Sequence, residues 1–159
     1  MSKEIRGGGV ELLDVIRPLW EELNVLHAER SPFFGDDYKA FAFDDRKKML
    51  LEKAAKGKLR IFIWAGEKRV IDGYCIASLD GYEGEIDSIY VKKEGRKSGI
   101  GTALMKECLE WLKKNGSERI KVVVAYGNED VFDFYKKFEL FPRATTLTTL
   151  QWHTGKRPQ

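Results

Sequence analysis

The 159-residue sequence contains few residues of several kinds, and each shortage limits what the protein can be. Cysteine occurs only as Cys75 and Cys108, each inside an apolar stretch, so we expect two free thiols in the core of a protein from a reducing compartment. No Cys and His residues have the spacing of metal ligands, so we expect no metal site. No apolar run approaches the ~18 residues of a membrane span, and the first residues lack the apolar core of a signal peptide. We therefore expect a soluble, cytoplasmic protein.

Charge of one sign is not in large excess either. There are 28 Lys and Arg residues and 25 Asp and Glu residues, and the net charge of +3 is too small to indicate nucleic acid. Basic residues do cluster at 92–97, which favours a small polyanion as ligand. The length suits one domain, and 43% apolar residues argue against disorder. We expect one domain over residues 1–153 and a polar C-terminal tail over 154–159.

The apolar patterns predict an α+β fold with α/β-type layers and no internal repeat. The run of β-branched residues at 120–126 predicts a central strand covered on both faces, parallel to the strand before it because a helix connects the two. Other strands are expected around Ile5 and over 59–65, 70–79, 85–91, 140–141 and 145–152. Helices are expected over 10–29 with a kink or new start at Pro18, from a cap at Asp44 or Asp45 to Gly57, over 100–115, and after a cap at Asn128.

The stretch 85–102 combines a strand, a basic turn with glycines and the start of a helix. The free N–H groups of a first helical turn and the helix dipole favour an anion at that place. Gly99 and Gly101 would let the backbone approach a phosphate closely. Neither the P-loop pattern GxxxxGK[ST] nor the dinucleotide pattern GxGxxG is present, so the phosphate-binding segment is of another kind.

This turn, Arg96-Lys97-Ser98-Gly99-Ile100-Gly101, has the form [RQ]xxGx[GA]. In that setting it resembles the acetyl-CoA pyrophosphate loop of the GNAT superfamily of N-acetyltransferases. Three further places match the family: the strand ending Ile89-Tyr90-Val91, the strand 120–126, and Asn128 followed by Val131 and Tyr135.

The resemblance covers about residues 58–141 and is strongest over 85–135. It departs from the family pattern at Glu139-Leu140, where Gly-Phe is frequent, which affects the turn and not the site.

The resemblance implies a mixed sheet, mostly antiparallel, in which one parallel strand pair is splayed to hold acetyl-CoA, with helices on both faces. It implies an acetyltransferase that moves the acetyl group of acetyl-CoA directly to a primary amine in a ternary complex, without a metal. The residues that would bind the cofactor are the backbone of Ile89, Tyr90 and Val91, the segment Arg96, Lys97, Ser98, Gly99, Ile100, Gly101 and Thr102, and the side chains of Asn128 and Tyr135.

The catalytic groups follow from the same resemblance. Tyr135 matches the tyrosine near the CoA sulfur and would be the general acid. Glu85 matches the position of the base in histone-type members, and Asp87 lies on the same face of the strand. The base could thus be Glu85, Asp87 or a water, whereas Val123 excludes the glutamate of the ribosomal-protein-type members.

The sequence is compatible with several acceptor amines and with more than one acceptor site. A small amine, a polyamine, an aminoglycoside, a peptide N-terminus and a protein lysine are all compatible with the sequence. Acidic residues over 33–45, namely Asp36, Asp37, Asp44 and Asp45, would favour a cationic acceptor if they lie near the groove, or they are a solvated surface. His27 could serve the site or be structural, and His153 is a weaker candidate.

Three other possibilities accompany this prediction. A non-catalytic acyl-CoA-binding or regulatory module could have the same fold. The basic turn could bind nucleic acid, which we do not expect, and no membrane contact is expected. Pairing of the strand expected at 145–152 with a second copy would give a homodimer.

Overall fold

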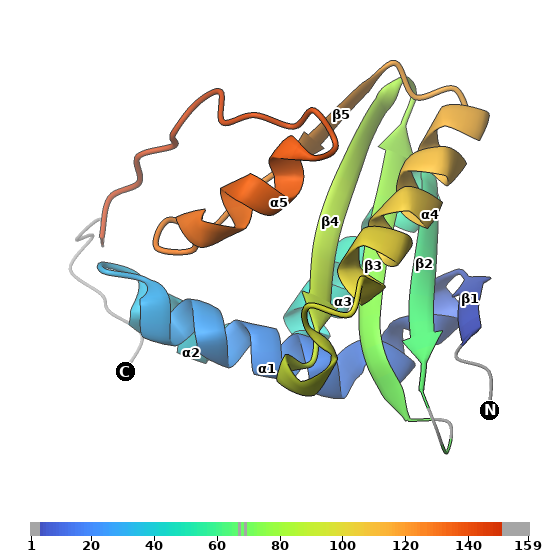
Figure 1. Ribbon diagram of the computed structural model, residues 1–159. Helices are drawn as coiled ribbons and strands as arrows, with labels where there is room; N and C mark the ends of the chain where they lie inside the picture. Colours follow the sequence, from blue (N-terminus) through green and yellow to red (C-terminus); the bar gives the residue numbers. More distant parts are fainter. Residues whose placement is uncertain (1–3, 67, 69, 151–159) are drawn as a thin grey trace.

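A computed structural model describes residues 4–66, 68 and 70–150 (Figure 1). It contains one five-stranded sheet in the order β1-β2-β3-β4-β5. Neighbouring strands are antiparallel except for the parallel pair β4 and β5, so the expected mixed sheet is confirmed. The strands are β1 (Glu4–Gly8), β2 (Lys58–Ala65), β3 (Ile71–Asp80), β4 (Glu83–Val91) and β5 (Arg119–Val122).

Helices cover both faces of the sheet, as expected, with α4 on one face and α1 and α3 on the other (Figure 1). The helices are α1 (Leu13–Arg30), α2 (Gly35–Ala40), α3 (Phe43–Lys56), α4 (Ile100–Lys114) and α5 (Phe132–Lys136). Short 3₁₀ turns lie at η1 (Val10–Leu12), η3 (Lys93–Gly95) and η4 (Glu129–Val131). In the described part of the chain, no helix is both long and apolar enough to cross a membrane.

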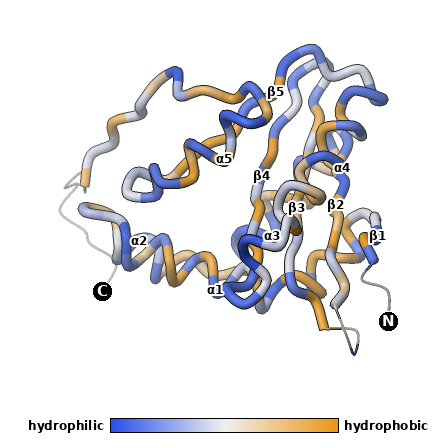
Figure 2. Tube along the Cα trace, in the orientation of Figure 1, coloured by the Kyte–Doolittle hydropathy of each residue, from blue (hydrophilic) through white to orange (hydrophobic). Residues whose placement is uncertain are grey.

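Two hydrophobic cores result from the alternation of side chains along β2 and β3. Tyr74 and Ile76 face α1 and α3, whereas Cys75 and Ala77 face α4. Hydrophobic segments are seen in orange along β2, β3 and β4 (Figure 2). The two cysteines are free and fully buried, in agreement with the expected core thiols.

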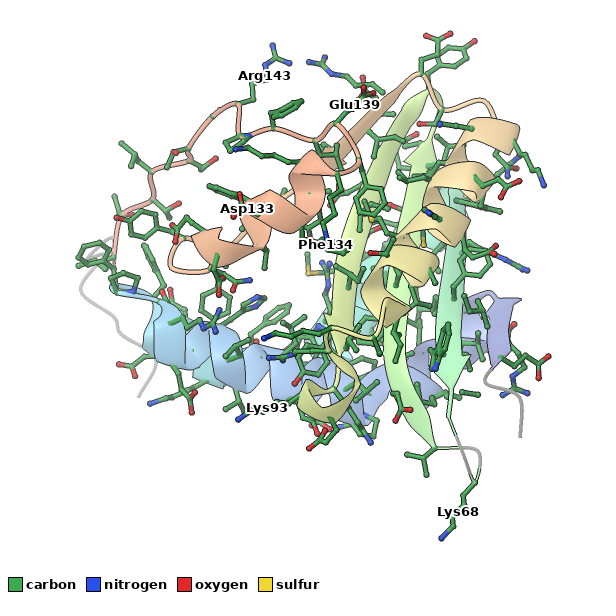
Figure 3. The ribbon with its side chains drawn as sticks, in the orientation of Figure 1. Lys68, Lys93, Asp133, Phe134, Glu139 and Arg143 are labelled. Atoms are coloured by element: carbon green, nitrogen blue, oxygen red, sulfur yellow. The ribbon has the colours of Figure 1, made fainter. Side chains whose placement is uncertain are left out.

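Helix α5 is attached to the α4 side of this arrangement. Phe134 points from α5 toward the sheet and packs against the core, whereas Asp133 is exposed on the opposite side (Figure 3). The Phe134 ring also makes an edge contact with the ring of Phe138, with 5.3 Å between their centroids. These contacts hold α5 beside β4 and so place Tyr135 next to the sheet.

The N-terminal helices differ from the prediction in three respects. α1 continues through Pro18, so no new helix starts there, because burial of Ile16 and Leu19 outweighs the one hydrogen bond that proline removes. Helix α2 occupies part of the expected loop at 33–45. The N-cap of α3 is Ala42, not Asp44 or Asp45, and its backbone N–H donates to Asp45 Oδ2.

The C-terminal part differs most from the prediction. β5 ends at Val122, and as the last strand of the sheet it is an edge strand rather than a central one, with Val123 77% exposed. The strands expected at 140–141 and 145–150 are wrong, because this segment runs away from β5 and has no strand to pair with among the described residues (Figure 1). Residues 151–152, His153 and the expected tail 154–159 lie outside the described residues. A homodimer through this segment stays a prediction.

Candidate functional site

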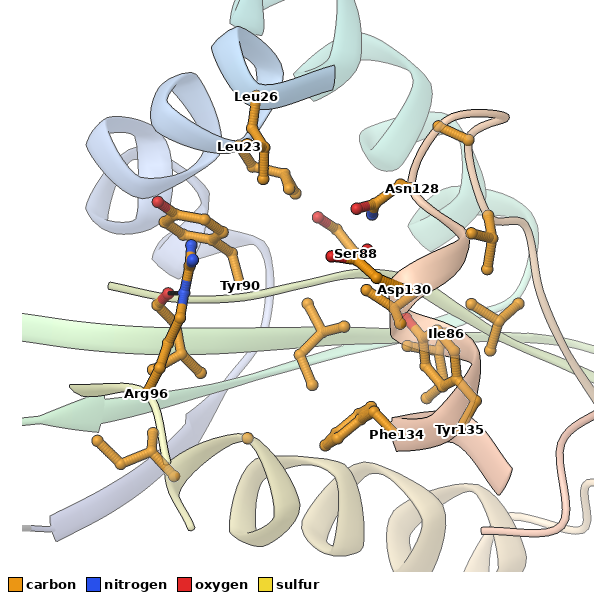
Figure 4. Close-up of a pocket in the computed structure, with 18 of the residues that line it drawn as sticks. Leu23, Leu26, Ile86, Ser88, Tyr90, Arg96, Asn128, Asp130, Phe134 and Tyr135 are labelled. Carbon is orange, nitrogen blue, oxygen red and sulfur yellow. Dashed lines mark hydrogen bonds between the residues drawn. The ribbon is translucent and has the colours of Figure 1, made fainter. Parts of the chain in front are cut away.

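The parallel strands β4 and β5 separate after a short stretch of pairing. β5 pairs with β4 only from Glu83 to Ile86, so the edge of β4 over residues 87–91 has no partner on the β5 side within the described chain. A cleft of about 760 Å³ lies at this separation, between α1, β4, the start of α4, residues 122–125 and α5 (Figure 4). Free N–H and C=O groups along a strand edge can pair with an extended ligand.

A β-bulge shapes the free part of β4. The register places Ile76 opposite Ser88 and Ala77 opposite Ile86, so Asp87 is the additional residue on β4. The Tyr74 and Ser88 hydroxyl oxygens lie 2.7 Å apart and fix the strand beyond the bulge. Because a bulge increases twist and redirects the following residues, it turns the edge of β4 away from β5.

The N-terminus of α4 opens into the same cleft. Gly99, the N-cap, has a left-handed φ of +83°, and a Cβ built there would meet no atom within 4 Å. Lys97 also has a positive φ of 66°. Successive left-handed and helical residues direct N–H groups into one concavity, as an anion requires. All residues predicted for this segment line the cleft except Ser98, whose hydroxyl donates to the Gly95 carbonyl instead.

The Arg96 side chain lies against β4, and contacts with that strand hold it in place. Its Nε donates to the Val91 carbonyl at 3.1 Å, and its guanidinium lies 5.4 Å from the centre of the Tyr90 ring (Figure 4). The predicted strand residues Ile89, Tyr90 and Val91 line the cleft beside it. The positive charge thus stands where β4 ends and α4 begins, next to the free N–H groups.

The opposite wall carries Asn128 and Tyr135, as predicted, and both line the cleft (Figure 4). Tyr135 is only 8% exposed, and burial, together with the neighbouring Cys75, raises the pKa of its phenol. Tyr135 therefore keeps its proton at neutral pH. Asn128 occupies the N-cap position of η4, but its side chain makes no capping bond; it accepts a hydrogen bond from Arg30.

The two carboxylates predicted as base candidates have different positions. Asp87 lines the cleft, with its side chain fully buried and bound to Lys53. Burial raises the pKa of the Asp87 carboxyl, and the Lys53 ammonium partly opposes that shift. Glu85 is not among the lining residues and makes ion pairs with Lys53 at 3.2 Å and Lys121 at 3.6 Å.

The acidic residues of the 33–45 segment are not brought to the cleft. None of them lines it. Asp44 pairs with Arg17 at 3.4 Å, Asp45 binds the backbone at Ala42, and Asp36 and Asp37 lie in the first turn of α2. All four are exposed, in line with the alternative that this segment is a solvated surface, and a role toward a cationic acceptor stays a prediction.

Helix α1 supplies residues that sequence reasoning missed or left open. Leu23, Leu26, His27 and Arg30 line the cleft opposite β4. Burial lowers the pKa of the His27 imidazole, and the nearby Arg30 lowers it further. His27 was a candidate on its residue type alone, whereas nothing local marks Arg30, whose partners are about a hundred residues away. No group of three metal-binding side chains occurs within the ranges that the structure describes.

Part of this chain is similar in sequence to a named protein. A 53-residue stretch, 33% of this chain, is 38% identical to the protein named Uncharacterized N-acetyltransferase MJ1207 of Methanocaldococcus jannaschii, of which it covers 24%. The match thus spans about a quarter of that relative's length.

Solved structures resemble the whole fold. A tetramutant of the BH1408 protein from Bacillus halodurans has a TM-score of 0.71 at 16% identity, over 92% of this chain and 98% of that one. The PaiA N-acetyltransferase of Thermoplasma acidophilum, in complex with coenzyme A, has a TM-score of 0.66 at 19% identity, over 87% of this chain and 89% of that one. At these identities the likeness concerns the fold alone. The family model "Acetyltransferase (GNAT) family" matches residues 20–139, most of the chain, and the protein therefore belongs to the GNAT family.

Proposed function

We propose that the protein transfers the acetyl group of acetyl-CoA to a primary amine of a small molecule, peptide or protein. One observation carries this proposal: the left-handed Gly99 and the N-terminus of α4 open into a cleft beside the unpaired edge of β4. The N–H groups at the helix start suit the pyrophosphate, and the β4 edge over 87–91 suits the amides of the pantetheine arm. The CoA complex of the PaiA structure supports the same cosubstrate.

The reaction requires stabilisation of an oxyanion and two proton transfers. The amine attacks the thioester carbonyl, and the backbone N–H of Ile89, which the alternation along β4 directs away from β3, would donate to the oxyanion. Tyr135, which remains protonated, would give its proton to the departing thiolate.

The proton of the ammonium must leave before attack, since free amines are mostly protonated near neutral pH. Asp87 is the better candidate for base because it lies in the cleft wall, and Glu85 does not. Its carboxylate is fully buried, so it would act through a water rather than by direct contact. The remaining carboxylate of the lining, Asp130, is paired with Arg30.

Replacement of Tyr135 by Phe tests this function. Acetylation of a panel of amines by acetyl-CoA, followed by mass spectrometry, should identify an acceptor for the wild type. On that acceptor, Tyr135→Phe should lower kcat by about 10²–10⁴-fold while the Kd of acetyl-CoA stays unchanged. Tyr126→Phe is the matched control, because Tyr126 is 62% exposed and lies outside the cleft lining. Tight CoA binding without acetylation of any amine would instead support a non-catalytic acyl-CoA-binding module.

A further inference from the structure

Arg30, the last residue of α1, binds two residues of the segment that follows β5. Its Nη1 donates to Asn128 Oδ1 at 2.7 Å and lies 3.1 Å from both carboxylate oxygens of Asp130. All three residues line the cleft, where Asn128 and Asp130 are seen on the side of α5 (Figure 4). The contact therefore bridges the two walls of the cleft, which come from opposite halves of the sequence.

Two neighbouring contacts show that this bridge is built into the fold. The backbone at Gly127 approaches the Arg30 carbonyl so closely that a Cβ would stand 2.3 Å from its oxygen, and its φ is +104°. The rings of Phe33 and Tyr126 stack with their centroids 6.4 Å apart. The backbone at Arg30 is thus packed beside Gly127, so the Arg30 side chain is kept near Asn128 by more than one exposed ion pair.

The bridge determines which way the Asn128 amide faces. An asparagine side chain has one acceptor oxygen and one donor NH₂ group, on opposite sides of its amide carbon. Because the Arg30 N–H can bind only the oxygen, the NH₂ group is directed away from Arg30. This NH₂ group donates no hydrogen bond to any residue that the structure describes. It is therefore available as a donor in the cleft.

We propose that Arg30 is a positioning residue that presents the Asn128 NH₂ group to a carbonyl oxygen of the pantetheine arm, with Asp130 holding the guanidinium. This inference rests on the proposed function, since it assigns a role toward acetyl-CoA. It requires that the contribution of Arg30 to cofactor binding passes through Asn128 and not through a direct contact.

Calorimetric titration of acetyl-CoA into matched variants tests this coupling. Asn128→Ala should raise Kd by about three- to tenfold, the value of one hydrogen bond, and Arg30→Met should raise it similarly. The double variant should bind no more weakly than Asn128→Ala alone. Asn128→Asp keeps a partner for Arg30 but offers no donor, so it should bind at least as weakly as Asn128→Ala. Arg30→Lys can still donate to Oδ1 and should recover part of the loss.

A control separates this role from simple closure of the cleft. Phe33→Ala removes the ring stack without touching Arg30 or Asn128, and it should lower the Tm while leaving Kd within about twofold. The inference is overturned if Arg30→Met leaves Kd unchanged, if its effect multiplies with that of Asn128→Ala, or if Phe33→Ala weakens binding equally. Failure of the wild type to bind acetyl-CoA would instead overturn the proposed function itself.

Discussion

At the scale of single residues, Asp87, Tyr135 and His27 are among the cleft side chains whose pKa values burial shifts, each toward its uncharged form. The pKa values of the Asp87 carboxyl and the Tyr135 phenol are raised, and that of the His27 imidazole is lowered. A common cause, loss of water around the charged form, explains all three directions. An environment of low polarity would also strengthen hydrogen bonds to a developing oxyanion.

The lowered pKa of His27 has a consequence for stability. The unfolded chain takes up a proton near the ordinary value of 6.5, whereas the folded protein resists protonation until a lower pH. The contribution of neutral His27 to the free energy of unfolding is therefore fully present above about pH 6.5, and it is lost as pH falls through the pKa of the folded protein. We expect the unfolding free energy, measured in urea across this range, to fall less steeply for His27→Gln. Identical slopes for both proteins would contradict a lowered pKa.

The buried pair of Lys53 and Asp87 predicts a second pH-dependent effect. Breaking a fully buried pair costs about 3–5 kcal/mol, and because the Lys53 side chain is 34% exposed we expect Lys53→Met to cost about 2 kcal/mol at neutral pH. In Lys53→Met the Asp87 pKa, which is already raised, would rise further, because the ammonium that opposes the shift is gone. The loss of unfolding free energy should therefore shrink as pH falls and Asp87 becomes neutral.

Denaturant unfolding near neutral pH and near pH ~5 measures this difference. Lys56→Met is the control on the same helix, because its ion pair with Asp80 is exposed and should contribute less than about 1 kcal/mol. An equal loss for Lys53→Met at both pH values would show that the Asp87 charge is not the cause.

At the scale of elements, the unit of strand, loop and helix at the site was predictable because its signals are local. Its observed parts, β4 and α4, begin and end within about two residues of the expected ranges. The glycine at the start of α4 was likewise correctly identified as conformationally special. Most of the residues expected to bind the cofactor are local to this unit, and all of these except Ser98 line the cleft.

Features that depend on distant partners were not predictable. The run after Val122 has the composition of a strand but is left without a neighbour, because the chain diverges from β4. Arg30 joins the site through residues 98 and 100 positions away. The family resemblance predicts Glu85 as a base, but only the structure shows two lysines bound to it outside the cleft. Periodicity cannot reveal such contacts.

The junction between α1 and the segment after β5 gives a prediction at this scale. Gly127→Ala places a methyl group 2.3 Å from the Arg30 carbonyl in a left-handed backbone, so the junction must open. Gly81→Ala is the matched control, because its φ is also positive at 62° but its Cβ would meet nothing within 4 Å. We expect Gly81→Ala to lose about 1–2 kcal/mol, the cost of the left-handed backbone alone, and Gly127→Ala to lose more. Equal losses in denaturant unfolding would show that the junction is not tightly packed.

At the scale of the whole molecule, the cleft forms where two differently supported parts meet. β1 to β4 are packed on both faces by α1, α3 and α4. β5 and α5 join this body through four residue pairs between β4 and β5, the packing of Phe134 and Tyr135, and the Arg30 bridge. The free edge of β4 and the N-terminus of α4 therefore belong to the part of the fold that is packed on both faces, and the wall with Asn128 and Tyr135 lies opposite them across the cleft.

Calorimetric binding of acetyl-CoA to Gly99→Asp tests the central claim most directly. The substitution places a side chain and a negative charge at the start of α4, where we locate the pyrophosphate. Gly116→Asp, at the other end of the same helix, has a similar φ of +90° and equally open surroundings, so it reproduces the backbone strain away from the cleft. We expect the wild type and Gly116→Asp to bind alike and Gly99→Asp to bind at least about tenfold more weakly. Binding by Gly99→Asp as tight as that of the wild type would contradict the assignment of this cleft to acetyl-CoA.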